Sequence, residues 1–337
     1  FFLIQGCSTN NSSEKKFDID WMYSDQGRLV GSVYKSAWID DNILYLMDMR
    51  KPKEQRTLLK MDPMNSGVFI QLIDNEKIAK DILSAVGRTD TTMYLEWPNS
   101  FSSSGEFGLY TFEDDLYLLD IKNQDYTRIT RTKNVEKAAR FSPDGKKISF
   151  VRENDIYIYD IDTKKEKRIT FTGSDTNLNG TVSWVYWEEI FGRRDIGYWW
   201  SDDSEALAFL NTDESEVTKM HYVDWKPAEP ELITQRYPKA GTKNPEVKLG
   251  IIELESTKIK WVELGQYEYL CRVKWLPDNR RLSVQTMNRA QTELDLFFVD
   301  RATGKNVKKI FTEKDKGWVN ITDDLYFLKN SFMWQSE

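Results

Sequence analysis

Three short markers in this chain of 337 residues recur at one fixed offset of 40 residues. The first is the strand-like segment Asp115–Ile121, which returns in similar form at Asp155–Ile161. The others are an Arg-Ile-Thr triplet and a Phe-Ser-x-x-Gly turn, whose second copies lie at 168–170 and 141–145. A period of about 40 to 50 residues that holds several short strands is typical of a β-propeller blade. The repeat therefore predicts an all-β fold of the propeller type.

The blade pattern extends beyond these two copies. The segments 44–49 and 294–300 match the repeated strand, the second of them more weakly. An aromatic residue followed by a turn recurs at Phe141, Trp200 and Trp275, each time before a further apolar strand. Dividing the length of the chain by the period gives roughly six to seven blades.

The spacing of the aromatic markers shows where the repeat is interrupted. Phe141 and Trp200 lie 59 residues apart, and Trp200 and Trp275 lie 75 apart. Relative to the period, the first interval holds about 19 extra residues and the second about 35. Insertions in a repeat array map to loops, which often carry the binding face.

Each insertion has a pattern of its own. In the first, Trp184, Trp187 and Phe191 are spaced as one face of a short amphipathic helix that ends at Gly192. The second, at about Asn211–Lys243, contains three prolines, which exclude a single regular strand but allow an extended arm.

Composition excludes several classes of function. The net charge of −7 and the absence of a Lys/Arg stripe make nucleic acid an unexpected partner. The chain has two cysteines, Cys7 and Cys271, so no disulfide framework or zinc spacing is expected. His221 is the one histidine, and no Gly-x-Ser-x-Gly turn is present. We therefore expect no acyl-transfer catalysis from this chain by itself, and no metal or cofactor.

The first residues resemble a processed targeting segment. Phe1–Ile4 matches the end of a signal-peptide apolar region, and Ile4–Cys7 is similar to a bacterial lipobox, in which the cysteine is lipidated. Asn10–Lys16 then has the composition of a polar tether. The alternative is a chance cysteine in a frayed tail. The lipobox predicts a boundary between residues 1–16 and a propeller at 17–337, and a lipid-anchored protein of the bacterial cell envelope, in the periplasm or at the outer membrane.

Two stretches resemble the dipeptidyl-peptidase IV family of serine peptidases. Trp184–Phe191 is similar to that family's Trp-x-Tyr-Glu-Glu-Glu segment, and Arg236–Gly250 to its Tyr-Pro-Lys-Ala-Gly-x-x-Asn-Pro segment. The segments Trp199–Asp203 and Asn288–Gln291 also fit, in the same order. The resemblance is to the N-terminal eight-bladed propeller. It implies an α/β-hydrolase domain with a Ser-Asp-His triad beyond Glu337, and hence an incomplete chain.

The resemblance gives Glu188 and Glu189 a role. In the family, two adjacent glutamates on a helix of the propeller hold the free α-ammonium of the substrate. Two carboxylates in a partly desolvated pocket can both accept charge-assisted hydrogen bonds from one ammonium, and they repel each other when it is absent. Fixing the amine at a set distance from the nucleophile makes the enzyme an exopeptidase. An adjacent Glu pair without this resemblance is usually a solvated helix face.

The chain departs from the family pattern at several positions. Trp187 stands where the family has its first glutamate, and Ser183 where it commonly has aspartate. The family also uses a propeller-loop arginine on the substrate backbone, but the corresponding stretch 97–107 has no arginine. Arg193 and Arg194 follow the helix, where cations favour the helix dipole.

The leading hypothesis is the substrate-gating propeller of a lipid-anchored serine exopeptidase that removes N-terminal dipeptides. By family analogy, proline is favoured at the second position, and the region 211–243 is a dimerisation arm. Two alternatives stay open: a stand-alone propeller that binds peptide or glycan without catalysis, and a family member that has lost its nucleophile. The sequence beyond Glu337 would discriminate among them, through the presence or absence of a Gly-x-Ser-x-Gly turn.

Overall fold

The computed structural model describes residues 18–30, 33–64, 67–89, 92–329 and 331–336. Cys7 and the expected tether lie outside the described residues. The chain divides into two compact units, one of residues 1–83 with 90–97 and one of residues 84–89 with 98–337.

The first unit contains one antiparallel sheet with the strand order β1-β2-β3-β4. Its strands are β1 (Tyr34–Asp40), β2 (Ile43–Asp48), β3 (Leu59–Met61) and β4 (Phe69–Gln71). Short helices α1 (Ile19–Tyr23) and α2 (Asp25–Val30) precede the sheet, η1 (Lys53–Gln55) follows β2, and α3 (Asn75–Val86) follows β4.

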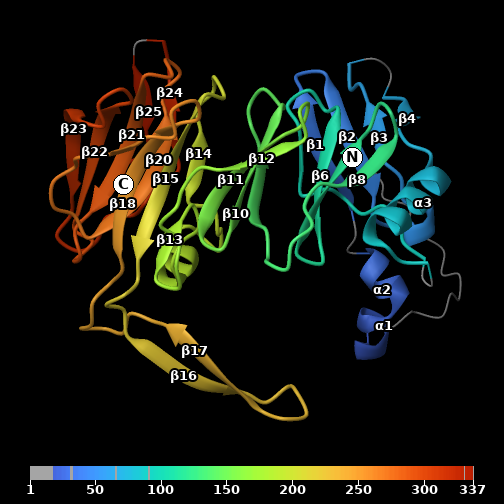
Figure 1. The fold of residues 1–337 in the computed structure, drawn as a ribbon, viewed down its shortest axis with the longest axis horizontal. Coiled ribbons are helices and arrows are strands. Elements are labelled where there is room, and N and C mark those ends of the chain that lie inside the picture. The colour runs from blue at the N-terminus through green and yellow to red at the C-terminus, as the bar shows by residue number, and fades with distance from the viewer. Residues whose placement is uncertain (1–17, 31–32, 65–66, 90–91, 330, 337) are drawn as a thin grey trace, which may run out of the picture. The chain divides into compact units, whose positions relative to one another are not determined.

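The second unit is a series of antiparallel sheets that follow one another in chain order, as the blades of a propeller do (Figure 1). The first two sheets are β5 (Ser100–Phe101), β6 (Phe107–Phe112), β7 (Asp115–Asp120), β8 (Asp125–Arg128), and β9 (Lys137–Phe141), β10 (Lys147–Arg152), β11 (Asp155–Asp160), β12 (Lys165–Arg168). The third is β13 (Asn177–Asn179), β14 (Tyr198–Trp200), β15 (Ala206–Asp213), β18 (Glu246–Glu253), β19 (Ile259–Trp261). The fourth is β20 (Tyr269–Trp275), β21 (Arg281–Met287), β22 (Glu293–Asp300), β23 (Asn306–Lys314), and β24 (Leu325–Phe327) pairs with β25 (Phe332–Trp334).

This arrangement confirms the all-β propeller that the repeat predicts. The repeated segments are β7 and β11, the third strands of their sheets, and the turn markers at 101–105 and 141–145 follow the first strands. The segment at 294–300 is β22, again a third strand. The segment at 44–49 is different, because its strand β2 is the second of its sheet. The blade number stays a prediction.

The physical reason for the Arg-Ile-Thr repeat is a buried hydrogen-bond network between the third and fourth strands. Thr170 Oγ1 donates to Asp155 Oδ1 at 2.6 Å and accepts from the amide of Ile156 at 2.8 Å. Arg168 forms an ion pair with the same carboxylate. Asp115, Arg128 and Thr130 make the same contacts one blade earlier. Each network satisfies polar groups that would otherwise be buried without partners.

The first insertion interrupts the edge strand of the third sheet that pairs with β15. β13 pairs with β15 at Asn211–Asp213, and β14 pairs with the same strand at Leu207–Phe209. Between them, the amide of Gly180 donates to Leu210 O at 2.9 Å and the amide of Leu210 donates to Gly197 O at 2.7 Å. The chain therefore leaves the strand after Gly180 and re-enters it at Gly197. Gly180 has φ +79°, and a Cβ there would lie 2.7 Å from Ile156, so the exit requires glycine.

The second insertion is a two-stranded hairpin of β16 (Lys219–Asp224) and β17 (Glu231–Arg236). It extends away from the sheets of its unit as the expected arm (Figure 1). Among the described strands, β16 and β17 pair only with each other, and the prolines of the insertion lie outside them. The expected boundary at Asn211 is too early, because residues 211–213 belong to β15.

Candidate functional site

The residues that leave the third sheet fold into the short helix that the spacing predicts. Trp184 and Val185 are α-helical, and Tyr186–Ile190 form one π-helical turn, η2. The amide of Phe191 donates to Tyr186 O at 2.8 Å, which is the i→i+5 bond of a π-helix. Single π turns occur frequently at functional sites.

The buried face of this helix differs from the expected one. Tyr186, Ile190 and Phe191 are buried, whereas Trp184 and Trp187 are only half-buried. The expected apolar face is confirmed for the buried Phe191 and for Trp187, which packs half-buried against the same core, whereas Trp184 is not part of that core. The buried Tyr186 and Ile190 were not on the expected face. The π turn widens the spiral, which changes the faces to which successive residues point.

The helix is attached to β20 by three groups. The buried Tyr186 hydroxyl accepts a hydrogen bond from the amide of Leu270 at 3.0 Å, and burial raises its pKa well above the usual value. Arg272 Nη1 donates to Ile190 O at 2.8 Å, which satisfies a carbonyl at the end of the helix. The ring of Phe191 lies under the Arg272 guanidinium. The helix backbone is thus fixed relative to the sheet.

The two glutamates occupy the outward side of this fixed helix. The side chain of Glu188 is 26% exposed, and Glu189 is more exposed. Glu188 accepts hydrogen bonds from Arg193, at 2.8 Å from Nη2 and 3.1 Å from Nε. This arginine lowers the pKa of the Glu188 carboxyl. Glu189 has no ion pair or hydrogen-bond partner among the described residues, so its carboxylate is open to a ligand.

The two arginines after the helix have different contacts. Arg194 Nε donates to Phe191 O at 2.8 Å, and its guanidinium pairs with Asp323. It is therefore a cation at the helix C-terminus, as expected. Arg193 instead turns back to Glu188, a contact that the sequence analysis missed. The sequence did offer a signal for this contact: Arg193 follows Glu188 by five residues and comes directly after Gly192.

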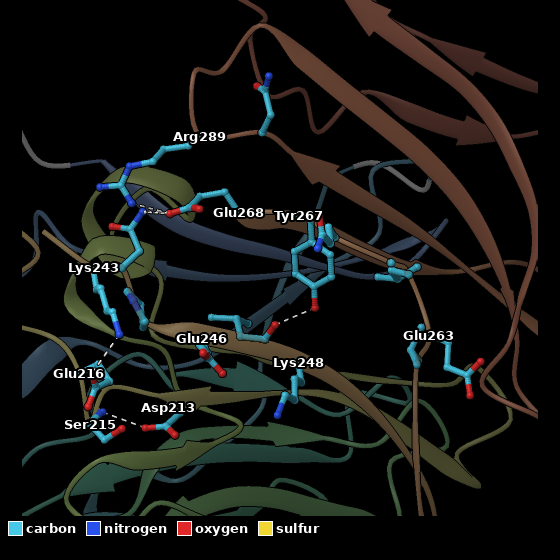
Figure 2. A pocket seen from close by; sticks show the side chains of 18 residues that line it. Asp213, Ser215, Glu216, Lys243, Glu246, Lys248, Glu263, Tyr267, Glu268 and Arg289 are labelled. Atoms are coloured by element: carbon cyan, nitrogen blue, oxygen red, sulfur yellow. Dashed lines mark hydrogen bonds and ion pairs between the residues drawn. The ribbon is translucent and has the colours of Figure 1, made fainter. Parts of the chain in front are cut away.

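A groove of about 1210 Å³ lies near the base of the arm, between the third and fourth sheets. Figure 2 shows its charged lining, with Arg289 directed toward Glu268 and Lys243 toward Glu216. Glu268 Oε1 accepts from Arg289 at 2.6 Å and from Asn244 Nδ2 at 2.6 Å. Two segments that carry the family resemblance, 236–250 and 288–291, therefore meet at one carboxylate. The glutamates of the helix do not line this groove.

Residues 102–337 match the model of the dipeptidyl peptidase IV (DPP IV) N-terminal region. The chain belongs to this family. The match covers the whole second unit from the end of β5 onward, including the helix and the arm, and it confirms the resemblance found in the sequence.

Two relatives show how far the similarity extends. The chain is 33% identical over 161 residues to a probable dipeptidyl peptidase 4 of Emericella nidulans, and 34% identical over 166 residues to dipeptidyl aminopeptidase B of Saccharomyces cerevisiae. These regions are 44% and 46% of this chain but 20% of each relative. The chain thus matches about a fifth of the length of these family members.

The fold also matches a solved structure, the crystal structure of Porphyromonas gingivalis dipeptidyl peptidase 4. The TM-score is 0.75 and the identity 24%, over 94% of this chain and 45% of that chain. At this identity the similarity establishes the propeller fold.

The histidine and the described cysteine lie on other elements than the helix, in β16 and β20. His221 lies on the exposed hairpin, 2.9 Å from Thr234 Oγ1, and burial raises the pKa of the Cys271 thiol to about 12. Ser183, at the position where the family commonly has aspartate, is buried, and its hydroxyl has no hydrogen-bond partner among the residues that the structure describes. The described residues contain no group of three metal-ligating side chains and no helix long and apolar enough to cross a membrane.

Proposed function

We propose that this chain is the amine-binding and substrate-gating propeller of a serine exopeptidase that releases N-terminal dipeptides. The observation that carries the proposal is the outward position of Glu188 and Glu189 on a helix fixed to β20. The named activities of the relatives support it, since those proteins are described as dipeptidyl peptidases or dipeptidyl aminopeptidases. A preference for proline at the second substrate position follows by analogy with the family.

The chemistry of the pair fits a free peptide N-terminus. An α-ammonium has three N–H donors, and the carboxylates of two consecutive residues offer it several acceptor oxygens. A helix with a fixed backbone holds the amine at a constant distance from a nucleophile outside this chain, so that only the second peptide bond reaches it. A peptide with an acylated N-terminus has no such charge, and we expect it to be a poor substrate.

The glutamates are tested in the full-length protein that contains this chain. We expect Glu188→Gln and Glu189→Gln each to lower kcat/KM for dipeptide substrates with a free amine by about tenfold to a hundredfold. The double variant should lose more, without strict additivity. Glu255→Gln, at an exposed turn remote in sequence, is the matched control and should leave kcat/KM unchanged.

A second readout separates binding from folding. The variants should also lose the discrimination between free and N-acetylated substrates, while their thermal unfolding stays at the parent midpoint. Parent-level kcat/KM in the double variant would mean that the pair is a solvated helix face, and the proposal would fail.

The alternative is a propeller that binds peptides without catalysis. The two candidates differ in the sequence that follows Glu337. A Gly-x-Ser-x-Gly turn there, with cleavage that stops when its serine is replaced, supports the exopeptidase. Binding of free-amine peptides that depends on Glu188 and Glu189 but leads to no cleavage supports the alternative.

Two further properties belong to the same proposal. Lipidation of Cys7 would attach the protein to the bacterial cell envelope, and the β16–β17 hairpin would form a symmetric dimer. The lipobox-like residues support the first, and the exposed apolar side chains of the hairpin support the second.

A further inference from the structure

The guanidinium of Arg193 already occupies part of the Glu188 carboxylate. Nη2 lies 2.8 Å from Oε1, and Nε lies 3.1 Å from Oε2, so the arginine fork contacts both oxygens. A carboxylate has about four lone-pair positions. The arginine therefore leaves room for a further donor on the same group.

The backbone after the helix places Arg193 in this position. Gly192 and Arg193 both adopt left-handed conformations, with φ of +56° and +65°. The amide of Arg193 donates to Trp187 O at 2.6 Å, and its guanidinium lies 6.0 Å from the centre of the Trp187 ring. The non-glycine left-handed residue is uncommon, and here it folds the arginine back along the helix.

No other described cation acts on Glu188. Arg272 is committed to Asp323 and to the carbonyl of Ile190, and Arg194 to Asp323 and the carbonyl of Phe191. Arg193 alone changes the charge balance at Glu188. The helix site thus carries two carboxylates and one guanidinium, a net charge of −1.

We infer that Arg193 is a positioning residue that gives Glu188 and Glu189 different roles in amine binding. It orients Glu188 as a hydrogen-bond acceptor, and Glu189 supplies the uncompensated negative charge. Together the three side chains match the single positive charge of one α-ammonium. This inference rests on the function proposed above. It adds Arg193, which lies just after the helix that carries the two glutamates.

The ion pair between Arg193 and Glu188 affects how kcat/KM depends on pH. Arg193 lowers the pKa of Glu188, so Glu188 stays ionised to lower pH with the arginine than without it. Removal of the arginine raises that pKa toward its ordinary value. Because amine binding needs the ionised carboxylate, the acidic limb of the kcat/KM profile should move to higher pH in Arg193→Ala.

The first test compares three variants of the full-length enzyme. Arg193→Ala should raise KM by about two- to fivefold, as expected for loss of an exposed ion pair, with kcat changed less than KM. Arg193→Lys should restore part of the loss. Arg194→Ala, which removes a neighbouring charge that does not touch Glu188, should leave the acidic limb in place.

The second test combines substitutions in the Glu188→Gln background. There the guanidinium has lost its partner and repels the substrate amine, so Arg193→Ala should now lower KM. The same change is therefore harmful in the parent and beneficial in Glu188→Gln. A purely structural role of Arg193 predicts harm in both backgrounds.

The outcomes separate this inference from the proposed function. If the glutamate variants are impaired but Arg193→Ala neither moves the acidic limb nor reverses its effect in Glu188→Gln, Arg193 has no positioning role and the amine-binding pair stands. If the glutamate variants have parent activity, the proposed function itself fails.

Discussion

A buried threonine hydroxyl connects the third and fourth strands in two neighbouring sheets. Thr170 is fully buried and contacts both Asp155 and the amide of Ile156, and Thr130 does the same one blade earlier. The sequence showed these residues as a repeat but not their purpose, because a period reports equivalent positions and not the contacts between them. The structure shows why a hydroxyl recurs: it serves a carboxylate and an amide at once.

Replacement of this hydroxyl should destabilise the propeller. Thr170→Val keeps the side-chain shape but leaves the Asp155 carboxylate and the Ile156 amide each without one partner. We expect a loss of about 1–3 kcal/mol in the free energy of unfolding, measured by urea denaturation. Thr163→Val is the control, since its hydroxyl bonds Asp160 at an exposed turn, and it should cost about 0.5 kcal/mol or less. Equal losses in the two variants would contradict the role of burial.

At the scale of elements, the helix was predictable in position but not in its faces. The roughly 19 extra residues between Phe141 and Trp200 located the helix correctly, because inserted residues must leave the ladder of paired strands. Tyr186 and Ile190 were not predicted as core residues, because the expected face follows α-helical spacing and the turn is a π-helix. The pairing of Glu188 with Arg193 was missed for a related reason, because it depends on two successive left-handed residues.

The docking of the helix can be tested through its buried tyrosine. Tyr186→Phe removes the hydroxyl that accepts from the amide of Leu270, leaving a buried N–H without a partner. We expect faster hydrogen exchange of the Leu270 amide, and a cost of about 1–3 kcal/mol in stability. Tyr23→Phe in the exposed helix α1 is the matched control, and it should change neither quantity. Unchanged exchange at Leu270 would mean that the hydroxyl does not hold the helix.

At the scale of the whole molecule, the period was the strongest predictor. It predicted units of several short strands, and four of the sheets formed by the described residues have four strands each. The segment at 44–49 shows that a match to the repeat does not fix the position of a strand within its sheet. It matched the third-strand pattern but is a second strand, since alternation followed by Asp48 describes any half-buried strand that ends in a turn.

The N-terminal prediction concerns attachment to the envelope. If Cys7 is lipidated on expression in a bacterial host, the mature protein should partition into a detergent phase, and a Cys7→Ala form should stay in the aqueous phase. Acyl chains supply the partition energy, about 0.8 kcal/mol per buried CH₂. Equal partition of the two forms would reject the lipoprotein interpretation.

The β16–β17 hairpin is the surface through which we expect two copies of the protein to form a dimer. An isolated two-stranded hairpin is marginally stable in water, and β16 and β17 pair with no other strand of the part of the chain that the structure describes. Yet apolar side chains of both faces reach solvent: the exposed Val223 opposes the exposed Leu232 on one face, and the exposed Tyr222 opposes the half-buried Ile233 on the other. Trp225, at the end of β16, is 75% exposed. A second copy of the arm, related by a two-fold axis, would cover this surface and complete the sheet.

Light scattering of the full-length protein tests this prediction. We expect the parent to have the mass of a dimer, and a form in which residues 219–236 are replaced by a short Gly-Ser linker to have the mass of a monomer. Leu232→Lys is a milder variant that keeps the hairpin, and it should weaken the dimer because it places a charge in the covered face. Lys219→Ala, at the exposed base of the arm, is the control. A dimer that survives the loss of the hairpin would show that another surface holds the copies together, and the exposed apolar side chains would then need a different partner.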